Sequence, residues 1–304
     1  MEKRLTISAM LFSVGFVFML VVAVGAFFYG VQLGSERMEA KYSAAMEGEG
    51  AIDESAVPYQ QQDLVSFYLT VFSSYREFQT EWLSVTDKLS RGASVDAPSA
   101  FKSLSKLAAA KAEEASSFNM QKSPLLGDAQ VAYIRSMNKF KEAANKAADS
   151  GASDHAALLK DIQEGSAYQA AVTAALAGQN AYYHAMLKWA ATVDLNIAGE
   201  YKTPATLSIK EWSSLPLTVK NYVIGQYLAD RKELYSFYPH DLTSRVDEFI
   251  YSGQASKMKL QTMNSIVELL LNTRAVDPGD FAPNRARYYD AETLPQLPFF
   301  YSQP

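Results

Sequence analysis

The chain has 304 residues, of which 48% are hydrophobic and 20% charged, a composition that allows a buried core and excludes a wholly disordered protein. It contains no cysteine, which excludes disulfide bonds and thiolate metal sites. Residues 1–34 carry a net charge of +1 and residues 35–56 a net charge of −4, which leaves only −2 on the remainder. A domain without a basic excess is not expected to bind nucleic acid.

Residues 1–34 are predicted to form a transmembrane anchor with a short N-terminal stub. The stretch from Ile7 to Leu33 has no ionisable side chain except Tyr29. About 20 apolar residues suffice to cross the hydrocarbon core of a bilayer. A single spanning segment must be helical, because lipid offers the backbone no hydrogen-bond partners. The membrane lipid bilayer is therefore one expected partner.

A cleaved signal peptide is the alternative interpretation of this stretch. Lys3 and Arg4 would form its basic region, and the small residues Ala23 and Gly25 would mark the cleavage site. The apolar region of a signal peptide usually runs for about 7–15 residues. Here the apolar run continues through Val31, which favours an uncleaved signal-anchor.

The orientation of the anchor is predicted from its flanks. Lys3 and Arg4 precede the apolar stretch, and Arg37 and Lys41 follow it, so the positive-inside bias is nearly balanced. A short leading stub and a large following domain favour a cytoplasmic N-terminus and an extracytoplasmic C-terminal domain. The predicted location is thus the cell membrane, with a single pass.

Small residues recur every four positions within the anchor, at Ala26, Gly30 and Gly34. This spacing lets two helices approach closely in lipid, which predicts either a homo-oligomer or docking to another membrane protein. The alternative is that glycine is simply common in transmembrane helices. Residues 35–58 follow as an acidic linker, in which Gly48, Gly50 and Pro58 break a helix and favour a flexible tether.

The domain of residues 59–304 is predicted to be all-α. Its first segment repeats large apolar residues at a spacing of three to four, from Leu64 through Trp82 to Leu89. Further helices are expected before Gly199. The first covers about 99–118 and is closed by Pro124, and the next starts near Gly127 with Asp128 as a possible N-cap. Asp154 can cap the helix after that, and a long helical pattern follows Gly165. Alanine-rich helices with short breaks are typical of an up-and-down helical bundle.

Additional C-terminal helices are predicted after residues 200–207, where the alanine-rich pattern of the bundle ends. Ser208 and Glu211 fit a capping box before Trp212. Helices are expected over 217–237, from Pro239 to Tyr251, and over 254–274. The pattern leaves open whether residues 204–304 form a second bundle or pack on the first.

The last segment, residues 280–304, is rich in proline and aromatic residues, which predicts an extended tail. Two interpretations stay open for it. The tail either folds back over its own domain, as its apolar content favours, or binds a partner.

No catalytic, cofactor or metal site is predicted. The three histidines, His155, His184 and His240, lack a second ligand at a recognised metal spacing, and HExxH, GxSxG, P-loop and GxGxxG motifs are absent. The carboxylate pairs Glu113–Glu114 and Asp247–Glu248 are adjacent in sequence, so they diverge on a helix and are expected on the solvated surface.

These patterns predict a membrane-anchored, non-enzymatic helical interaction or scaffolding protein of the bacterial cell envelope, which binds other envelope proteins. The alternative is an extracytoplasmic small-ligand-binding module that works with a partner subunit. Tyr182, Trp189 and Tyr227 are the candidate ligand or partner contacts. A large apolar cavity would favour the ligand-binding module, and a filled core with exposed aromatic residues would favour the scaffold.

Overall fold

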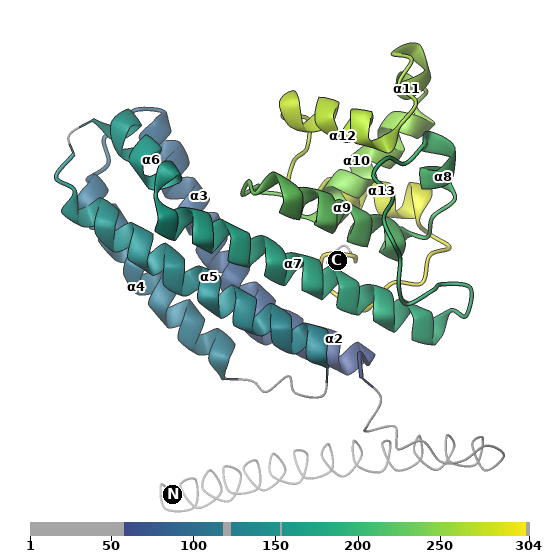
Figure 1. Cartoon of the computed structure of the whole chain (residues 1–304), viewed down its shortest axis with the longest axis horizontal. Coiled ribbons are helices and arrows are strands. Elements are labelled where there is room, and N and C mark those ends of the chain that lie inside the picture. The colour runs from purple at the N-terminus through teal and green to yellow at the C-terminus, as the bar shows by residue number, and fades with distance from the viewer. Residues whose placement is uncertain (1–57, 118–122, 153, 302–304) are drawn as a thin grey trace, which may run out of the picture. The chain divides into compact units, whose positions relative to one another are not determined.

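The computed structural model describes residues 58–117, 123–152 and 154–301, and all regular secondary structure in them is helical (Figure 1). The predicted all-α class is confirmed for this part of the chain. No helix within it is long and apolar enough to cross a membrane. The predicted anchor, with Ala26, Gly30 and Gly34, lies outside the described residues, as does the linker up to residue 57.

The first predicted helix runs continuously from Gln61 to Ser90 and contains a π-helical turn. It comprises α2 (Gln61–Phe67), the π turn η2 (Tyr68–Phe72) and α3 (Ser73–Ser90). Most of the predicted apolar stripe is buried: Leu64, Val71, Tyr75, Phe78, Trp82, Val85 and Leu89. Tyr68 of the predicted stripe is only half-buried, whereas Phe67 and Phe72, which the spacing did not include, are buried. Gly92 follows the helix at φ +70°, a left-handed conformation that glycine adopts without steric cost.

Three long helices complete the bundle, and the predicted helical bundle is confirmed (Figure 1). They are α4 (Ala97–Ser116), α5 (Pro124–Asp149) and α7 (Ser166–Val193). Helix α5 packs between α4 and α7. At Gly178 of α7 an added Cβ would lie 3.1 Å from the Tyr133 ring and 3.2 Å from the Ala129 carbonyl oxygen. A side chain at position 178 would therefore require the Tyr133 ring or the α5 backbone to shift by a few tenths of an ångström.

A short helix, α6 (His155–Glu164), connects α5 to α7 at the end of the bundle away from α2 (Figure 1). The predicted cap at its start is confirmed, because the Asp154 carboxylate accepts a hydrogen bond of 2.9 Å from the Ala156 amide. Gly165 is the single residue between α6 and α7, and a Cβ there would lie 3.1 Å from the Ile162 carbonyl oxygen. Glycine thus permits the tight corner between the two helices.

The predicted boundary at Pro124 is wrong. Pro124 begins α5 instead of closing α4, and Asp128 lies inside α5 instead of capping it. The Leu126 and Gly127 amides donate to the Ser123 carbonyl at 2.9 and 3.0 Å, so the helix starts there. Proline has no amide hydrogen and suits a first helical position, where that donor would lack an intrahelical partner.

The C-terminal helices pack on the bundle through its last long helix. They are α8 (Ile209–Ser213), α9 (Leu217–Arg231), α10 (Pro239–Tyr251), α11 (Gln254–Lys257), α12 (Met263–Asn272) and α13 (Phe281–Tyr288). Helix α9 lies along α7, α10 packs on α9, and α12 and α13 contact α10. Residues 58–304 form one compact unit, in which α9 is enclosed on most sides.

Local signals explain most of these boundaries. The capping box of Ser208 and Glu211 is confirmed, with both reciprocal hydrogen bonds present. The predicted helix over 217–237 stops at Arg231, because Lys232 takes a left-handed conformation at φ +55°. The predicted helix over 254–274 is interrupted after α11 and continues as α12. Thr262 is the N-cap of α12, and its hydroxyl accepts a hydrogen bond from the Ser265 amide.

The prediction that residues 280–304 are extended is wrong at its start, where α13 forms. Pro283 is the third residue of that helix, a position where a missing amide hydrogen breaks no intrahelical bond. Beyond α13 the described part of the tail is irregular and packs on its own domain. Leu294, Leu297 and Phe300 are buried, and the Gln296 amide donates to the Gln61 side chain at 3.1 Å. Partner binding by the tail stays a prediction.

Candidate functional site

A cavity of about 240 Å³ lies between α5, α6 and α7, at the end of the bundle that α6 covers. Its surface is mainly apolar and is formed by Ala143, Ala147, Leu158, Ile162, Ala167 and Tyr168. Alanines at positions 143 and 147 are four residues apart and therefore share one face of α5. Their short side chains leave the space that larger residues would fill.

Aromatic rings back this cavity on the bundle side. The Tyr168 ring stacks on Trp82 at 6.1 Å between centroids and meets Phe140 edge-on at 5.8 Å. Trp82 and Phe140 are themselves 4.7 Å apart. Burial raises the pKa of Tyr168, so its hydroxyl stays protonated at neutral pH. The wall is therefore well packed and uncharged.

Charge is found only where the cavity meets solvent. Lys146 of α5 and Asp161 of α6 line it and are exposed, together with Ser150. Neither charged group forms an ion pair with another described residue. The cavity thus combines an apolar interior with a rim that carries one positive and one negative charge.

A second group of polar residues is buried among the C-terminal helices. Lys220 Nζ lies 3.1 and 2.9 Å from the two carboxylate oxygens of Asp247, and the two side chains are 5% and 1% exposed. The Trp212 indole and the Tyr289 hydroxyl each donate to that carboxylate at 2.7 Å. The expectation that Asp247 and Glu248 lie on the solvated surface is therefore wrong. Asp247 is buried because three donors from other segments satisfy its charge, and Glu248 is half-buried against Arg245.

His240 is also buried, inside an aromatic cage. Its ring stacks on Phe299 at 4.7 Å, and its Nδ1 is 2.6 Å from the Tyr183 hydroxyl. Nε2 is 3.7 Å from an Asp241 carboxylate oxygen. This arrangement suits a neutral ring with its proton on Nε2, which accepts a hydrogen bond from Tyr183 at Nδ1.

The other two histidines have separate surroundings. His184 stacks on Tyr222 at 4.7 Å, and its Nε2 is 2.9 Å from Glu200. His155 is the first residue of α6. In residues 58–117, 123–152 and 154–301 no three side chains of the metal-ligating types gather at one place.

The three residues predicted as ligand or partner contacts lie apart from the cavity. Tyr182 is fully buried and donates to the Leu64 carbonyl at 3.2 Å, and Trp189 is buried on the same helix. The Tyr227 hydroxyl is hydrogen-bonded to Glu268. Their role as contacts stays a prediction. The sequence feature at the cavity is instead the pair of alanines at 143 and 147, a pair not singled out from the sequence.

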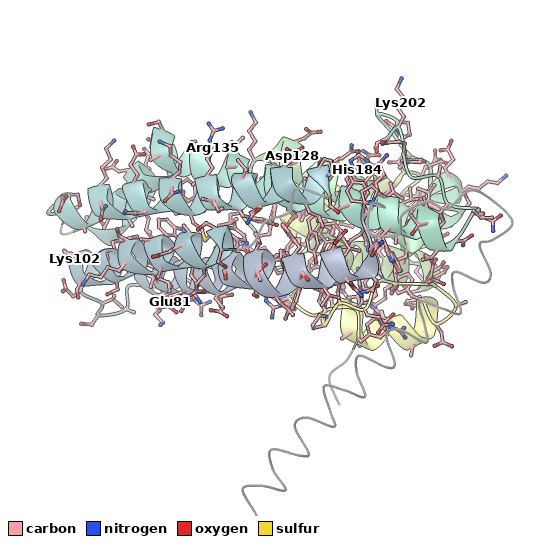
Figure 2. All side chains as sticks on the ribbon, turned by 90° about the horizontal axis from the view of Figure 1, so that it is seen from below. Glu81, Lys102, Asp128, Arg135, His184 and Lys202 are labelled. Carbon is pink, nitrogen blue, oxygen red and sulfur yellow. The ribbon has the colours of Figure 1, made fainter. Side chains whose placement is uncertain are left out.

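Exposed apolar side chains occur near the end of α10. Tyr251 is 54% exposed and Met258, just after α11, is 50% exposed. The Tyr251 ring stacks on Tyr288 of α13 at 4.9 Å, and the Arg287 guanidinium lies 4.9 Å from the Tyr288 ring centroid. We call Tyr251, Met258, Arg287 and Tyr288 the Tyr251 surface. Exposed apolar side chains occur on the bundle as well, at Leu69 and Val131. There they lie among charged side chains, and Figure 2 shows Glu81, Lys102 and Arg135 along the outside of the bundle.

Neither a protein-family model, nor a curated protein, nor a solved structure matches this chain. Its function is therefore inferred from its own residues.

Proposed function

We propose that this chain is a membrane-anchored, non-enzymatic helical interaction protein of the bacterial cell envelope, which acts by binding other envelope proteins. The apolar stretch of residues 7–33 supports the anchor, with the N-terminus in the cytoplasm and the helical domain outside it. The well-filled core supports a rigid domain, because buried aromatic residues run from α2 to the C-terminal tail. A rigid domain can present a preformed surface to a partner.

The observation that carries this proposal is the exposed stack of Tyr251 on Tyr288. Tyrosine and arginine are enriched at protein interfaces, and Tyr251, Tyr288 and Arg287 are joined by ring and cation–π contacts on this surface. A tyrosine ring brings a large contact area and loses little conformational entropy on binding. Stacking on Tyr288 already restricts the Tyr251 ring, so less freedom is lost when a partner covers it.

Site-specific photocrosslinking in cells tests the proposal. A photoreactive phenylalanine analogue replaces Tyr251 in the full-length chain, and a control chain carries it at Arg135 of α5, which is also exposed. We expect a reproducible partner adduct from position 251 and none from position 135. The absence of an adduct at 251, or the same adducts from both positions, would count against binding through this surface.

The anchor is tested by fractionation. The full-length chain is expected in the membrane fraction, and a chain lacking residues 1–34 is expected to leave it. Protease added to intact spheroplasts should digest the helical domain. A domain protected until the membrane is broken would reverse the proposed orientation.

A second function is supported by the cavity under α6. An apolar cavity bordered by a few polar groups is the usual form of a small-molecule site. The chain would then act as an extracytoplasmic ligand-binding module that works with a partner subunit. The two functions use different residues, because the cavity is formed by α5, α6 and α7 and the Tyr251 surface by α10, α11 and α13.

A further inference from the structure

We infer that the cavity between α5, α6 and α7 binds a small molecule with one aromatic ring or a short alkyl chain and a neutral or zwitterionic head group. The inference gives a ligand class to the second proposed function and rests on it. The interaction through the Tyr251 surface is independent of it, since no residue is shared.

The size of the cavity limits the apolar part of the ligand. The cavity has a volume of about 240 Å³ and opens to solvent at its rim. An apolar cavity of about 150 Å³ is known to accept benzene. The space here is larger than that and therefore accommodates a single substituted ring or a short alkyl chain.

The lining determines what can fill this space favourably. A buried water molecule needs two to four polar partners, and Ala143, Ala147, Leu158, Ile162 and Ala167 offer none from their side chains. Water in this part of the cavity is therefore easily displaced by an apolar group. The Tyr168 ring, held by Trp82 and Phe140, offers a fixed aromatic wall for contact with a ring.

The rim determines the preferred head group. Lys146 attracts a carboxylate, and Asp161 repels one but attracts an ammonium group. A zwitterionic ligand can place its carboxylate near Lys146 and its ammonium group near Asp161. An anion is attracted by Lys146 but repelled by Asp161. Because both side chains are exposed, their contribution to affinity is small compared with that of the apolar interior.

Three fluorinated probes test the inference by ¹⁹F NMR: the zwitterion L-4-fluorophenylalanine, the neutral 4-fluorophenol and the anion 4-fluorobenzoate. The full-length chain is studied in lipid nanodiscs, and empty nanodiscs correct for probe that partitions into lipid. We expect the chain to broaden the zwitterion and phenol signals more than the benzoate signal. No broadening beyond that of empty nanodiscs would overturn the inference, and benzoate binding as tightly as the zwitterion would overturn its head-group part.

Cavity-filling variants show whether the probes bind at this place. Ala147→Leu and Ala167→Leu place extra carbon atoms in the cavity and are expected to abolish the broadening. Ala110→Leu makes the same change at an exposed position of α4 and should leave it intact. Circular dichroism confirms that each variant keeps its helix content. Unchanged broadening in folded Ala147→Leu and Ala167→Leu would overturn the assignment.

A rim variant provides an independent readout without disturbing the core. Lys146→Gln removes one exposed charge and is expected to weaken L-4-fluorophenylalanine by about two- to fivefold, the range for an exposed ion pair. It should leave the affinity for 4-fluorophenol unchanged. Equal effects on both probes would contradict the proposed position of the head group at Lys146.

Discussion

Phe299 lies almost parallel to the imidazole of His240, with 4.7 Å between ring centroids and 13° between the planes. Phe299 also contacts Phe72 and Tyr68 of the π turn, at 5.9 and 5.7 Å. A π turn accommodates an additional residue in a helix and so alters which side chains share its face. Here Tyr68 and Phe72 of the first helix both contact the tail residue Phe299, which also stacks on His240 of α10. The C-terminal tail thereby links the first helix to α10.

The tail is therefore predicted to be a structural part of the domain. Phe300 is 1% exposed and packs on Phe281 at 5.4 Å. Phe300→Ala should lower the free energy of unfolding by about 3–5 kcal/mol, because it leaves a cavity in the core. Chemical denaturation measures this, with the exposed Thr293→Ala as control. A change below about 1 kcal/mol would show that the tail is dispensable for the fold.

The buried His240 predicts a dependence of stability on pH. Burial lowers the pKa of His240 below its ordinary value of 6.5; the nearby Asp241 opposes this shift and Arg76 adds to it. Just below pH 6.5 the unfolded chain therefore binds a proton that the folded chain does not. Stability should be complete above this pH and fall as the pH decreases, by up to about 1.4 kcal/mol per pH unit.

The matched control for this effect is a second histidine. His240→Gln should remove this component of the pH dependence between pH 7 and pH 5, whereas His155→Gln at the start of α6 should retain it. Thermal unfolding across this range measures both variants. If His240→Gln keeps the dependence of the parent chain, another group is responsible.

The Lys220–Asp247 pair is predicted to depend on both partners. Asp247→Asn removes the hydrogen-bonded counter-charge of the buried Lys220 ammonium and should cost about 3–5 kcal/mol of stability. Burial, the charge of Asp247 and the hydrogen bond to it raise the pKa of Tyr289, which therefore remains a protonated donor to that carboxylate. A double-mutant cycle with Lys220→Met should show strong coupling in denaturant unfolding. Additive losses would show that the two residues do not act as a pair.

Two helical glycines provide a matched test of close packing. Gly178→Ala should destabilise the domain by about 1–3 kcal/mol, because the new Cβ would lie 3.1 Å from Tyr133 and 3.2 Å from a backbone oxygen. At Gly225 the nearest atom to an added Cβ is 3.5 Å away, an ordinary contact. Gly225→Ala should be neutral or stabilising by up to about 1 kcal/mol, since alanine favours helices. The reverse order of stabilities would contradict the close approach of α7 to α5.

Local patterns in the sequence predicted much of this fold. The three-to-four spacing in residues 64–89 found the first helix, and the caps at Asp154 and Ser208 found two helix starts. These signals succeed because helical hydrogen bonds and caps join residues close in sequence. Prolines were harder to interpret: Pro124 and Pro283 both lie in the first turn of a helix, where proline is tolerated, instead of marking its end.

The sequence by itself determined the helical class, the absence of disulfides and the apolar stretch that predicts an anchor, because these depend on composition and local pattern. It also determined most helix positions, because helical hydrogen bonds join residues within about one turn. Only the tertiary structure decided that Asp247 is buried against Lys220 and that Ala143 and Ala147 border a cavity. Burial and empty space depend on which distant segments meet. The same alanine spacing can therefore give either close contact or a site for a ligand.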